Sequence, residues 1–156
     1  IIVPELSSTN RFAYCAESIF YLDTACGIVP NNKDYSTYLY LLGLLNSSLL
    51  EFYYKKTTVP KATGFYIYKT MFLKGLPIRR IDFNNLTEKK RHDDLVTLVD
   101  RMLELNKRLA PIRKTYCNER DELLKEIEQT DKEIDNIAYD LYGLTEEERK
   151  LVEGGL

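Results

Sequence analysis

The sequence of 156 residues contains no tryptophan, a single histidine and only three cysteines. Cys15, Cys26 and Cys117 show no CxxC spacing and form no zinc-ligand set with His92, so we expect no metal site. Their odd number argues against a disulfide framework and favours a reducing, cytoplasmic setting. No charge-free apolar run reaches the ~18 residues that a membrane span needs, so we expect no membrane partner.

Catalytic motifs are also missing. His92 lies in the charged run KKRHDD, which predicts a solvated surface residue rather than a member of a catalytic triad. The seven glycines are scattered and form no phosphate-binding loop, and the cysteines are expected to be buried as small apolar residues. We therefore expect no catalytic residue and no cofactor in this chain. Its opening, IIVPEL without methionine, favours a piece of a longer protein.

Acidic residues are absent from the thirty residues 52–81, which read FYYKKTTVPKATGFYIYKTMFLKGLPIRRI. This stretch holds seven bases and seven aromatic residues and has a net charge of +7, whereas residues 1–51 carry −3 and residues 82–156 carry −6. Basic groups attract phosphate, and aromatic or small polar side chains supply stacking or base-edge contacts. The stretch therefore predicts a nucleic-acid contact. The alternative is a solvated basic surface whose tyrosines belong to the core or its rim.

The first half of the chain predicts short strands around one buried helix. Residues 1–3, 11–15, 19–22, 26–29 and 65–68 have the composition of strands, and residues 7–10 predict a turn. Between residues 34 and 55 apolar side chains recur at three- and four-residue steps, which predicts a helix capped by Asp34 or Ser36. Residues 56–64 predict a loop, and Pro77 favours an extended segment over residues 76–78.

After residue 82 the chain predicts long helices. Thr87 is the expected N-cap, and the apolar residues that follow have the strict 3-4 spacing of a coiled coil or a helical hairpin. They are Leu95, Leu98, Met102, Leu105, Leu109, Ile112 and Tyr116. Pro111 should break this helix, a second should run from about Asn118 to Gly143, and Thr145 should begin a capping box for a last helix. The two long helices are expected to pair with each other or, alternatively, with another chain or domain.

Three strings in the sequence resemble a known family. LYLLGLLNSSLLEFYYK is followed by FLKGLPI about twenty residues later, and the chain ends with EIDNIAYDLYGLTEEERKLVE. In this order they resemble the TaqI-like C-terminal specificity domains of restriction-modification enzymes and N6-adenine DNA methyltransferases. The last string is also similar to the helical regions of type I specificity subunits. Together the matches span roughly residues 35–156.

The resemblance implies a target-recognition domain that reads DNA. In that family a methyltransferase domain carries S-adenosylmethionine and an Asn-Pro-Pro-Tyr-type catalytic motif, and a nuclease domain, with Mg²⁺, can precede it. This chain contains neither the Asn-Pro-Pro-Tyr-type motif nor a nuclease motif. The resemblance therefore places catalysis and the cofactor in a part of the protein outside this chain. Base-contacting residues differ between targets in the family and cannot be transferred to positions here.

Candidate DNA contacts come from the acid-free stretch, because its segment Lys55–Lys74 joins the first two matched strings. Its cations are candidates for phosphate or guanine contact, and its threonines and tyrosines for base-edge contact. The candidates are Lys55, Lys56, Thr57, Thr58, Lys61, Thr63, Tyr66, Tyr68, Lys69, Lys74, Arg79 and Arg80, with Asn10 and Arg11 on an N-terminal turn.

The sequence thus predicts an α+β fold, with a small β-containing recognition globule around a buried helix in residues 1–82. A coiled-coil-like helical hairpin, a spacer or docking arm, is expected in residues 83–156. The expected partners are double-stranded DNA and the methyltransferase or nuclease domain of the same parent protein. The alternative function is a protein-interaction module that assembles subunits through its heptad helices and does not read DNA.

Overall fold

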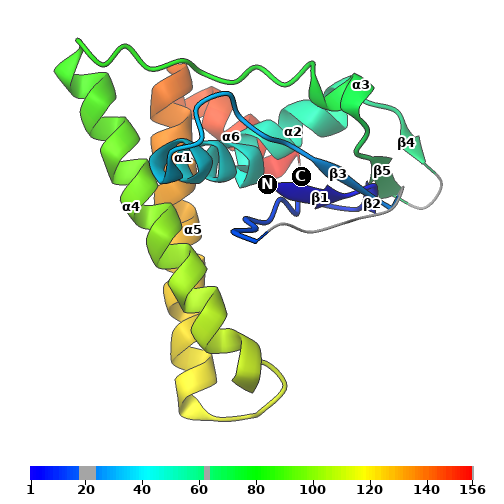
Figure 1. Ribbon diagram of the computed structural model, residues 1–156, viewed down its shortest axis with the longest axis vertical. Helices are drawn as coiled ribbons and strands as arrows, with labels where there is room; N and C mark the ends of the chain where they lie inside the picture. Colours follow the sequence, from blue (N-terminus) through cyan, green and yellow to red (C-terminus); the bar gives the residue numbers. More distant parts are fainter. Residues whose placement is uncertain (18–23, 62–63, 156) are drawn as a thin grey trace.

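The structure is a computed structural model that describes residues 1–17, 24–61 and 64–155. Two long helices, α4 (Leu86–Leu109) and α5 (Asn118–Tyr142), form an antiparallel hairpin. The remaining elements pack beside one half of this hairpin, so that the other half projects away from them (Figure 1). Helices and small antiparallel sheets together confirm the predicted α+β class.

Two small sheets form the β part of the globule. β1 (Ile2–Pro4) pairs antiparallel with β3 (Ala25–Gly27). In the second sheet β5 (Phe65–Ile67) lies between β2 (Leu6–Ser7) and β4 (Pro60–Lys61). Strands predicted at residues 1–3, 26–29 and 65–68 are confirmed in place, with small shifts of their ends. The prediction at residues 19–22 lies outside the described residues.

The strand predicted at residues 11–15 is wrong. Only Ala13 forms a bridge, to Ile2. The backbone of Phe12 is instead bonded by the side-chain amide of Asn46, whose oxygen accepts from the Phe12 nitrogen at 2.9 Å and whose nitrogen donates to the Phe12 oxygen at 2.9 Å. One side chain therefore satisfies the groups that a neighbouring strand would have paired.

The helix predicted over residues 34–55 is two helices, α1 (Tyr35–Asn46) and α2 (Ser48–Thr57). Asp34 caps α1 as predicted, since its carboxylate accepts from the Thr37 nitrogen at 2.7 Å. The break falls at Ser47, whose extended backbone ends α1 and whose hydroxyl accepts from the Leu50 nitrogen at 3.3 Å to cap α2. A serine that caps the next helix interrupts an apolar pattern that continues on both sides.

The region after α2 also differs from the expected loop at residues 56–64. Helix α2 continues to Thr57, and residues 60–61 are the edge strand β4. A one-turn helix, α3 (Thr70–Leu73), follows β5 and was not indicated by the sequence. An extended linker, residues 74–85, then leads to α4 and includes the predicted extended segment at 76–78.

The ends of the long helices follow the local signals closely. The N-cap of α4 is Asn85 rather than Thr87, because the Asn85 side chain accepts from the backbone nitrogens of Thr87 and Glu88. A 3-10 turn, η2 (Ala110–Ile112), ends α4 at Pro111, and Gly143 ends α5 with φ of 70°. The predicted capping box starts α6 (Glu146–Gly154). None of the described helices is both long and apolar enough to cross a membrane.

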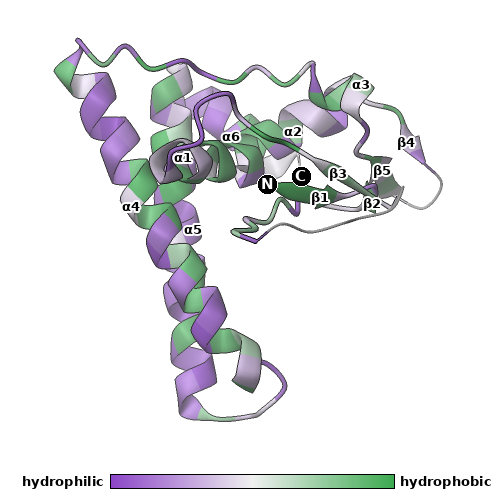
Figure 2. Ribbon diagram, viewed as in Figure 1, coloured by the Kyte–Doolittle hydropathy of each residue, from purple (hydrophilic) through white to green (hydrophobic). Residues whose placement is uncertain are grey.

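The main core joins the strands, α1, α2 and the hairpin in one cluster. Leu44 from α1, Leu95 from α4 and Ala138 from α5 are each 0% exposed within it. A second, smaller cluster lies farther along the hairpin and holds Leu105, Leu109 and Leu123, with Ile112 and Ile127 beside them. Apolar residues of α4 and α5 alternate with polar ones along the hairpin, as the heptad pattern requires (Figure 2).

The apolar seam of α4 thus closes within the chain, as an intramolecular hairpin. Tyr116 was expected on that seam, but it is 94% exposed because the chain has already turned after η2. The main core draws on both sides of the domain boundary predicted at residues 82 and 83, which stays a prediction.

His92 and the cysteines differ from expectation. His92 is only 8% exposed, with its ring 5.0 Å from that of Tyr40 and 5.1 Å from that of Phe83, centroid to centroid. The predicted solvated position is wrong because α1 and the linker cover this part of α4. Cys15, Cys26 and Cys117 are free and partly exposed rather than buried.

Asp135 of α5 contacts the start of α2 and provides a test of this packing by pH. Its carboxylate accepts from the Ser48 nitrogen at 2.7 Å and from the Ser48 hydroxyl at 2.6 Å. Burial raises the pKa of Asp135, an effect that the bonds from Ser48 only partly offset. A raised folded-state pKa means that ionisation opposes folding, so this group's contribution to stability falls as pH rises from about 3.9 through the folded-state pKa.

We expect Asp135→Asn to remove that pH dependence. The free energy of unfolding of the variant, minus that of the wild type, should increase as pH rises from about 4 through the folded-state pKa of Asp135. Urea unfolding at several pH values measures this difference. Asp121→Asn, an exposed carboxylate on the same helix, is the control. Parallel stability curves for wild type and Asp135→Asn would contradict the prediction.

Candidate nucleic-acid interface

The acid-free stretch covers two parts of the structure. The first is the end of the globule that lies away from the hairpin, and the second is most of the linker that leads back to the hairpin. The stretch comprises the second half of α2, β4, β5 and α3, which lie together, and most of the linker that returns from α3 to the start of α4 (Figure 1). Strand β4 is the edge of its sheet. We refer to residues 52–73 of this stretch, from the second half of α2 to the end of α3, as the basic end.

Among the described residues, five of the candidate cations are exposed and make no ion pair. In the described part of the chain, no carboxylate oxygen lies within 4.0 Å of Lys61, Lys74, Arg80 or Arg11. The charge of these side chains is therefore not neutralised locally. Lys56 is also exposed, and its ammonium lies over the Phe52 ring at 5.2 Å from the centroid. Such cations are suited to contact phosphate.

Three other candidate cations are paired with acids from outside the stretch. Lys55 lies 2.6 Å from Glu51, and their side chains are 16% and 13% exposed. Lys69 lies 2.9 Å from Glu5 of the N-terminal segment. Arg79 lies 2.9 Å from Glu88 of α4. The net charge of the stretch therefore overstates the positive charge that this surface presents.

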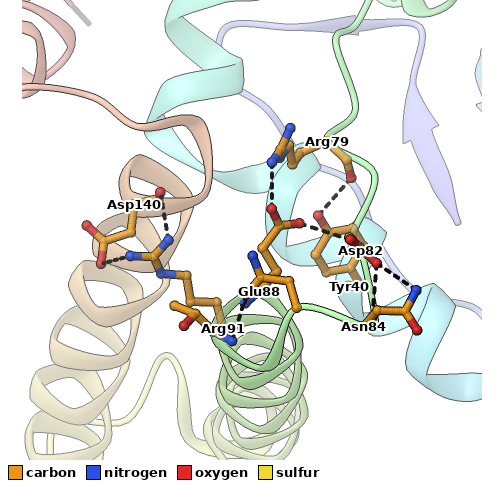
Figure 3. A network of polar contacts seen from close by, with 9 residues as sticks. Tyr40, Arg79, Asp82, Asn84, Glu88, Arg91 and Asp140 are labelled. Atoms are coloured by element: carbon orange, nitrogen blue, oxygen red, sulfur yellow. Dashed lines mark hydrogen bonds and ion pairs between the residues drawn. The ribbon is translucent and has the colours of Figure 1, made fainter.

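The Arg79 pair belongs to a set of bonds that fixes the linker to the long helices (Figure 3). The Tyr40 hydroxyl donates to the Arg79 carbonyl oxygen at 2.8 Å, and Glu88 also accepts from the Asp82 nitrogen at 3.0 Å. The Tyr142 hydroxyl donates to the Pro77 carbonyl at 2.5 Å. The linker is thereby held on both α1 and the hairpin, and its cations have a defined position relative to the globule.

Thr57 and Thr58 have local hydrogen-bond partners. The Thr57 hydroxyl donates to the Tyr53 carbonyl at 2.8 Å and is exposed, while the Thr58 hydroxyl donates to the Tyr54 carbonyl at 2.5 Å and is half-buried. Tyr66 is half-buried in the central strand β5. Thr63 lies outside the described residues. Of these side chains, Thr57 is the most accessible to a ligand.

Tyr68 lies in the interior rather than on the surface, and Asn10 is half-buried and uses its side chain within the fold. Tyr68 is 0% exposed and stacks on Tyr54, with ring centroids 4.6 Å apart. Its hydroxyl donates to the Asn10 side chain at 2.8 Å, and the same amide donates to the Leu45 carbonyl at 2.6 Å. Burial raises the pKa of Tyr68 and raises that of Tyr54 to about 12. The expected DNA contact of Tyr68 is therefore wrong, and Asn10 uses its side chain to hold the turn that displays Arg11.

The structure adds apolar side chains to the basic end. Val59 is 79% exposed, Met71 is 73% exposed and Phe65 is 38% exposed. Apolar contact with the thymine methyl group is one way in which proteins read bases in the major groove. Val59 stood out in sequence only as part of the expected loop, and no sequence signal pointed to Met71. In the described residues no group of three or more His, Cys, Asp or Glu side chains could hold a metal.

The pairing of Lys55 leads to a prediction that separates it from Lys61. We expect Lys55→Ala to leave the salt dependence of DNA binding unchanged, because its ammonium is already bonded to Glu51 in a largely buried position. The same change should lower the free energy of unfolding by about 1–2 kcal/mol, because it removes a charged hydrogen bond. Lys61→Ala should do the opposite, with unchanged stability and a lower salt slope. Filter binding across a salt series and urea unfolding measure both quantities, and a reduced salt slope for Lys55→Ala would contradict the assignment.

Comparison with known proteins agrees with the resemblance seen in the sequence. The family model of the TaqI-like C-terminal specificity domain matches residues 1–78, which is half of the chain and contains the whole basic end. Comparison with the curated proteins and with the solved structures gives no match. The matched region, with its strands, α1, α2 and α3, shows that the chain belongs to the family of TaqI-like C-terminal specificity domains.

Proposed function

We propose that this chain is the sequence-specific DNA-binding part of a restriction-modification enzyme or an N6-adenine DNA methyltransferase. The observation that carries the proposal is the basic end with Lys61 and the adjoining Lys74, which have no acidic partner among the described residues and lie within the region matched to a specificity domain. Phosphate contacts from these cations would position the domain on the duplex. Side chains such as Thr57, Val59 and Phe65 would then contact base edges.

The rest of the chain would serve as a rigid support for this surface. Base-reading segments work best when a scaffold fixes their position. Here the Tyr54–Tyr68 stack lies beneath β5, and the linker bonds at Arg79 join the basic end to the hairpin. The hairpin would dock against the catalytic domain of the parent protein. S-adenosylmethionine, and Mg²⁺ for a nuclease, would be bound by that domain.

The alternative of a protein-interaction module loses its main support. It relied on the heptad seam of α4, whose residues Leu95, Leu105 and Leu109 are buried within this chain. The seam is thus not open for a second coiled-coil partner along this length.

The proposal is tested by binding the protein to a pool of random duplexes at low and at physiological salt. We expect salt-sensitive binding that enriches one short motif, because cations give the salt dependence and base contacts give the selection. A scrambled duplex of equal composition is the control for the enriched motif. Salt-sensitive binding without enrichment would leave only a phosphate-binding role, and no binding at low salt would overturn the proposal.

A further inference from the structure

The tip of the helical hairpin is a second basic surface, in a part of the chain that is otherwise acidic. Residues 82–156 have a net charge of −6, yet residues 105–118 contain four bases and no acid. The bases are Lys107 and Arg108 at the end of α4, and Arg113 and Lys114 in the turn to α5. Acidic residues resume in the first turn of α5, with Glu119 and Asp121, so the acid-free part of the tip is the end of α4 and the turn itself.

The tip is a folded structure with its own small core. Leu105, Leu109 and Leu123 form the second hydrophobic cluster, and Ile112 packs against it from η2. Pro111 lies in η2, where its ring fixes the backbone. The Arg120 side chain donates to the Arg113 carbonyl oxygen at 3.1 Å and so ties α5 to the turn. Arg113 and Lys114 thus project from a defined turn.

The charges at the tip are only weakly compensated. In the described residues no carboxylate lies within 4.0 Å of Arg113 or Lys114, and both are exposed. Arg108 and Glu119 approach only to 3.9 Å and Lys107 and Glu104 only to 3.8 Å. Pairs this long and this exposed contribute little. The tip therefore presents net positive charge to solvent.

An exposed aromatic ring accompanies these cations. Tyr116 is 94% exposed, and the Arg120 guanidinium lies over its ring at 5.4 Å from the centroid. The basic end also combines cations with aromatic rings, since the Lys56 ammonium lies over the Phe52 ring. The two surfaces share one chemistry, although they come from different parts of the chain.

The hairpin carries this second surface away from the globule. Helix α4 contacts α1 closely at Val99. A Cβ added to Gly43 of α1 would lie only 2.7 Å from a side-chain carbon of Val99. Leu109 is ten residues farther along the helix, which corresponds to about 15 Å at 1.5 Å per residue. The projecting hairpin and the globule thus form the two sides of an open angle (Figure 1).

We infer that the hairpin tip binds the phosphate backbone of the same duplex that the basic end reads, outside the recognised bases. This inference rests on the proposed function. A duplex offers one phosphate charge per ~1.7 Å of its axis, so a projecting basic tip meets phosphate at any sequence. Such a contact adds affinity and orients the protein on the duplex, but it does not select bases.

The test compares a tip variant with a charge-matched control. Arg113→Ala combined with Lys114→Ala removes two positive charges from the tip. Lys125→Ala combined with Lys150→Ala removes the same charge from exposed positions on α5 and α6. Binding to a duplex of about 30 base pairs around the enriched motif is measured across a salt series, with hydroxyl-radical footprinting of each complex.

The tip variant is expected to lower the salt slope by up to about two and to lose one patch of backbone protection outside the motif. Its selection of the motif should be unchanged, and the control should behave as the wild type. A tip variant with the wild-type slope and footprint would overturn the inference while the proposed function stands. Loss of binding to polyglutamate with unchanged DNA binding would overturn it in favour of an acidic protein partner. Absence of any DNA binding by the wild type would overturn both.

Discussion

Replacing Lys61, Lys74 and Arg80 together with alanine is expected to lower the affinity for duplex DNA by about two to three orders of magnitude at 0.1 M salt. All three side chains are exposed and lack an acidic partner in the described part of the chain. Removing one phosphate contact should reduce the salt slope by ~0.9, and removing three at this salt concentration gives the stated change in affinity. Fluorescence anisotropy across a salt series measures both quantities.

The matched control for this triple variant removes three lysines from the acidic helices. Lys125, Lys132 and Lys150 are exposed on α5 and α6, so their replacement changes the net charge equally. The control is expected to keep the wild-type salt slope. Equal reductions of affinity in the two variants would mean that overall charge, rather than the basic end and linker, governs binding, and the assignment of this surface would then fail.

A second large effect is expected in the core, where Leu95→Ala should lower the free energy of unfolding by about 2–5 kcal/mol. Leu95 is 0% exposed and reaches Gly43 at the contact between α4 and α1. Helix α1 approaches α4 closely at this glycine, so removal of the leucine leaves a cavity between two packed helices. Urea unfolding measures the effect, followed by far-ultraviolet circular dichroism and by tyrosine fluorescence, which twelve tyrosines and no tryptophan make a usable probe.

Leu86→Ala is the matched control on the same helix. Leu86 is 81% exposed, so its removal should change stability by less than about 0.5 kcal/mol. We expect both probes to report one transition in every variant, because the main core joins the globule and the hairpin. Two separate transitions, with only one shifted by Leu95→Ala, would contradict this and would support independent folding units on either side of residue 82.

The sequence predicted best those features that depend on a few neighbouring residues. The break at Pro111, the left-handed Gly143 and the capping box at Thr145 were all in place. Each is set by local backbone chemistry, which a short segment displays by itself. The start of α4 was misplaced by two residues, because Asn85 and Thr87 are both good caps and only the bonds formed distinguish them.

The candidate site was predicted less completely, because exposure and pairing depend on distant segments. Lys69 and Arg79 are paired with Glu5 and Glu88, acids that lie outside the acid-free stretch. Tyr68 was a candidate contact by composition, but its hydroxyl bonds Asn10, which is 58 residues away in the chain. Local charge counting cannot reveal such partners.

The sequence by itself determined that this protein has an α+β fold, a helical arm and a basic stretch, residues 52–81, most of which lies within the matched specificity domain. Periodicity, caps and composition suffice for that, since they act over a few residues. Only the tertiary structure decided which cations stay accessible, where α1 ends and that the tip of the arm carries charge in a defined turn. These depend on long-range contacts, such as Asp135 with Ser48 and the packing of Leu109 on Leu123, which form only when the chain folds.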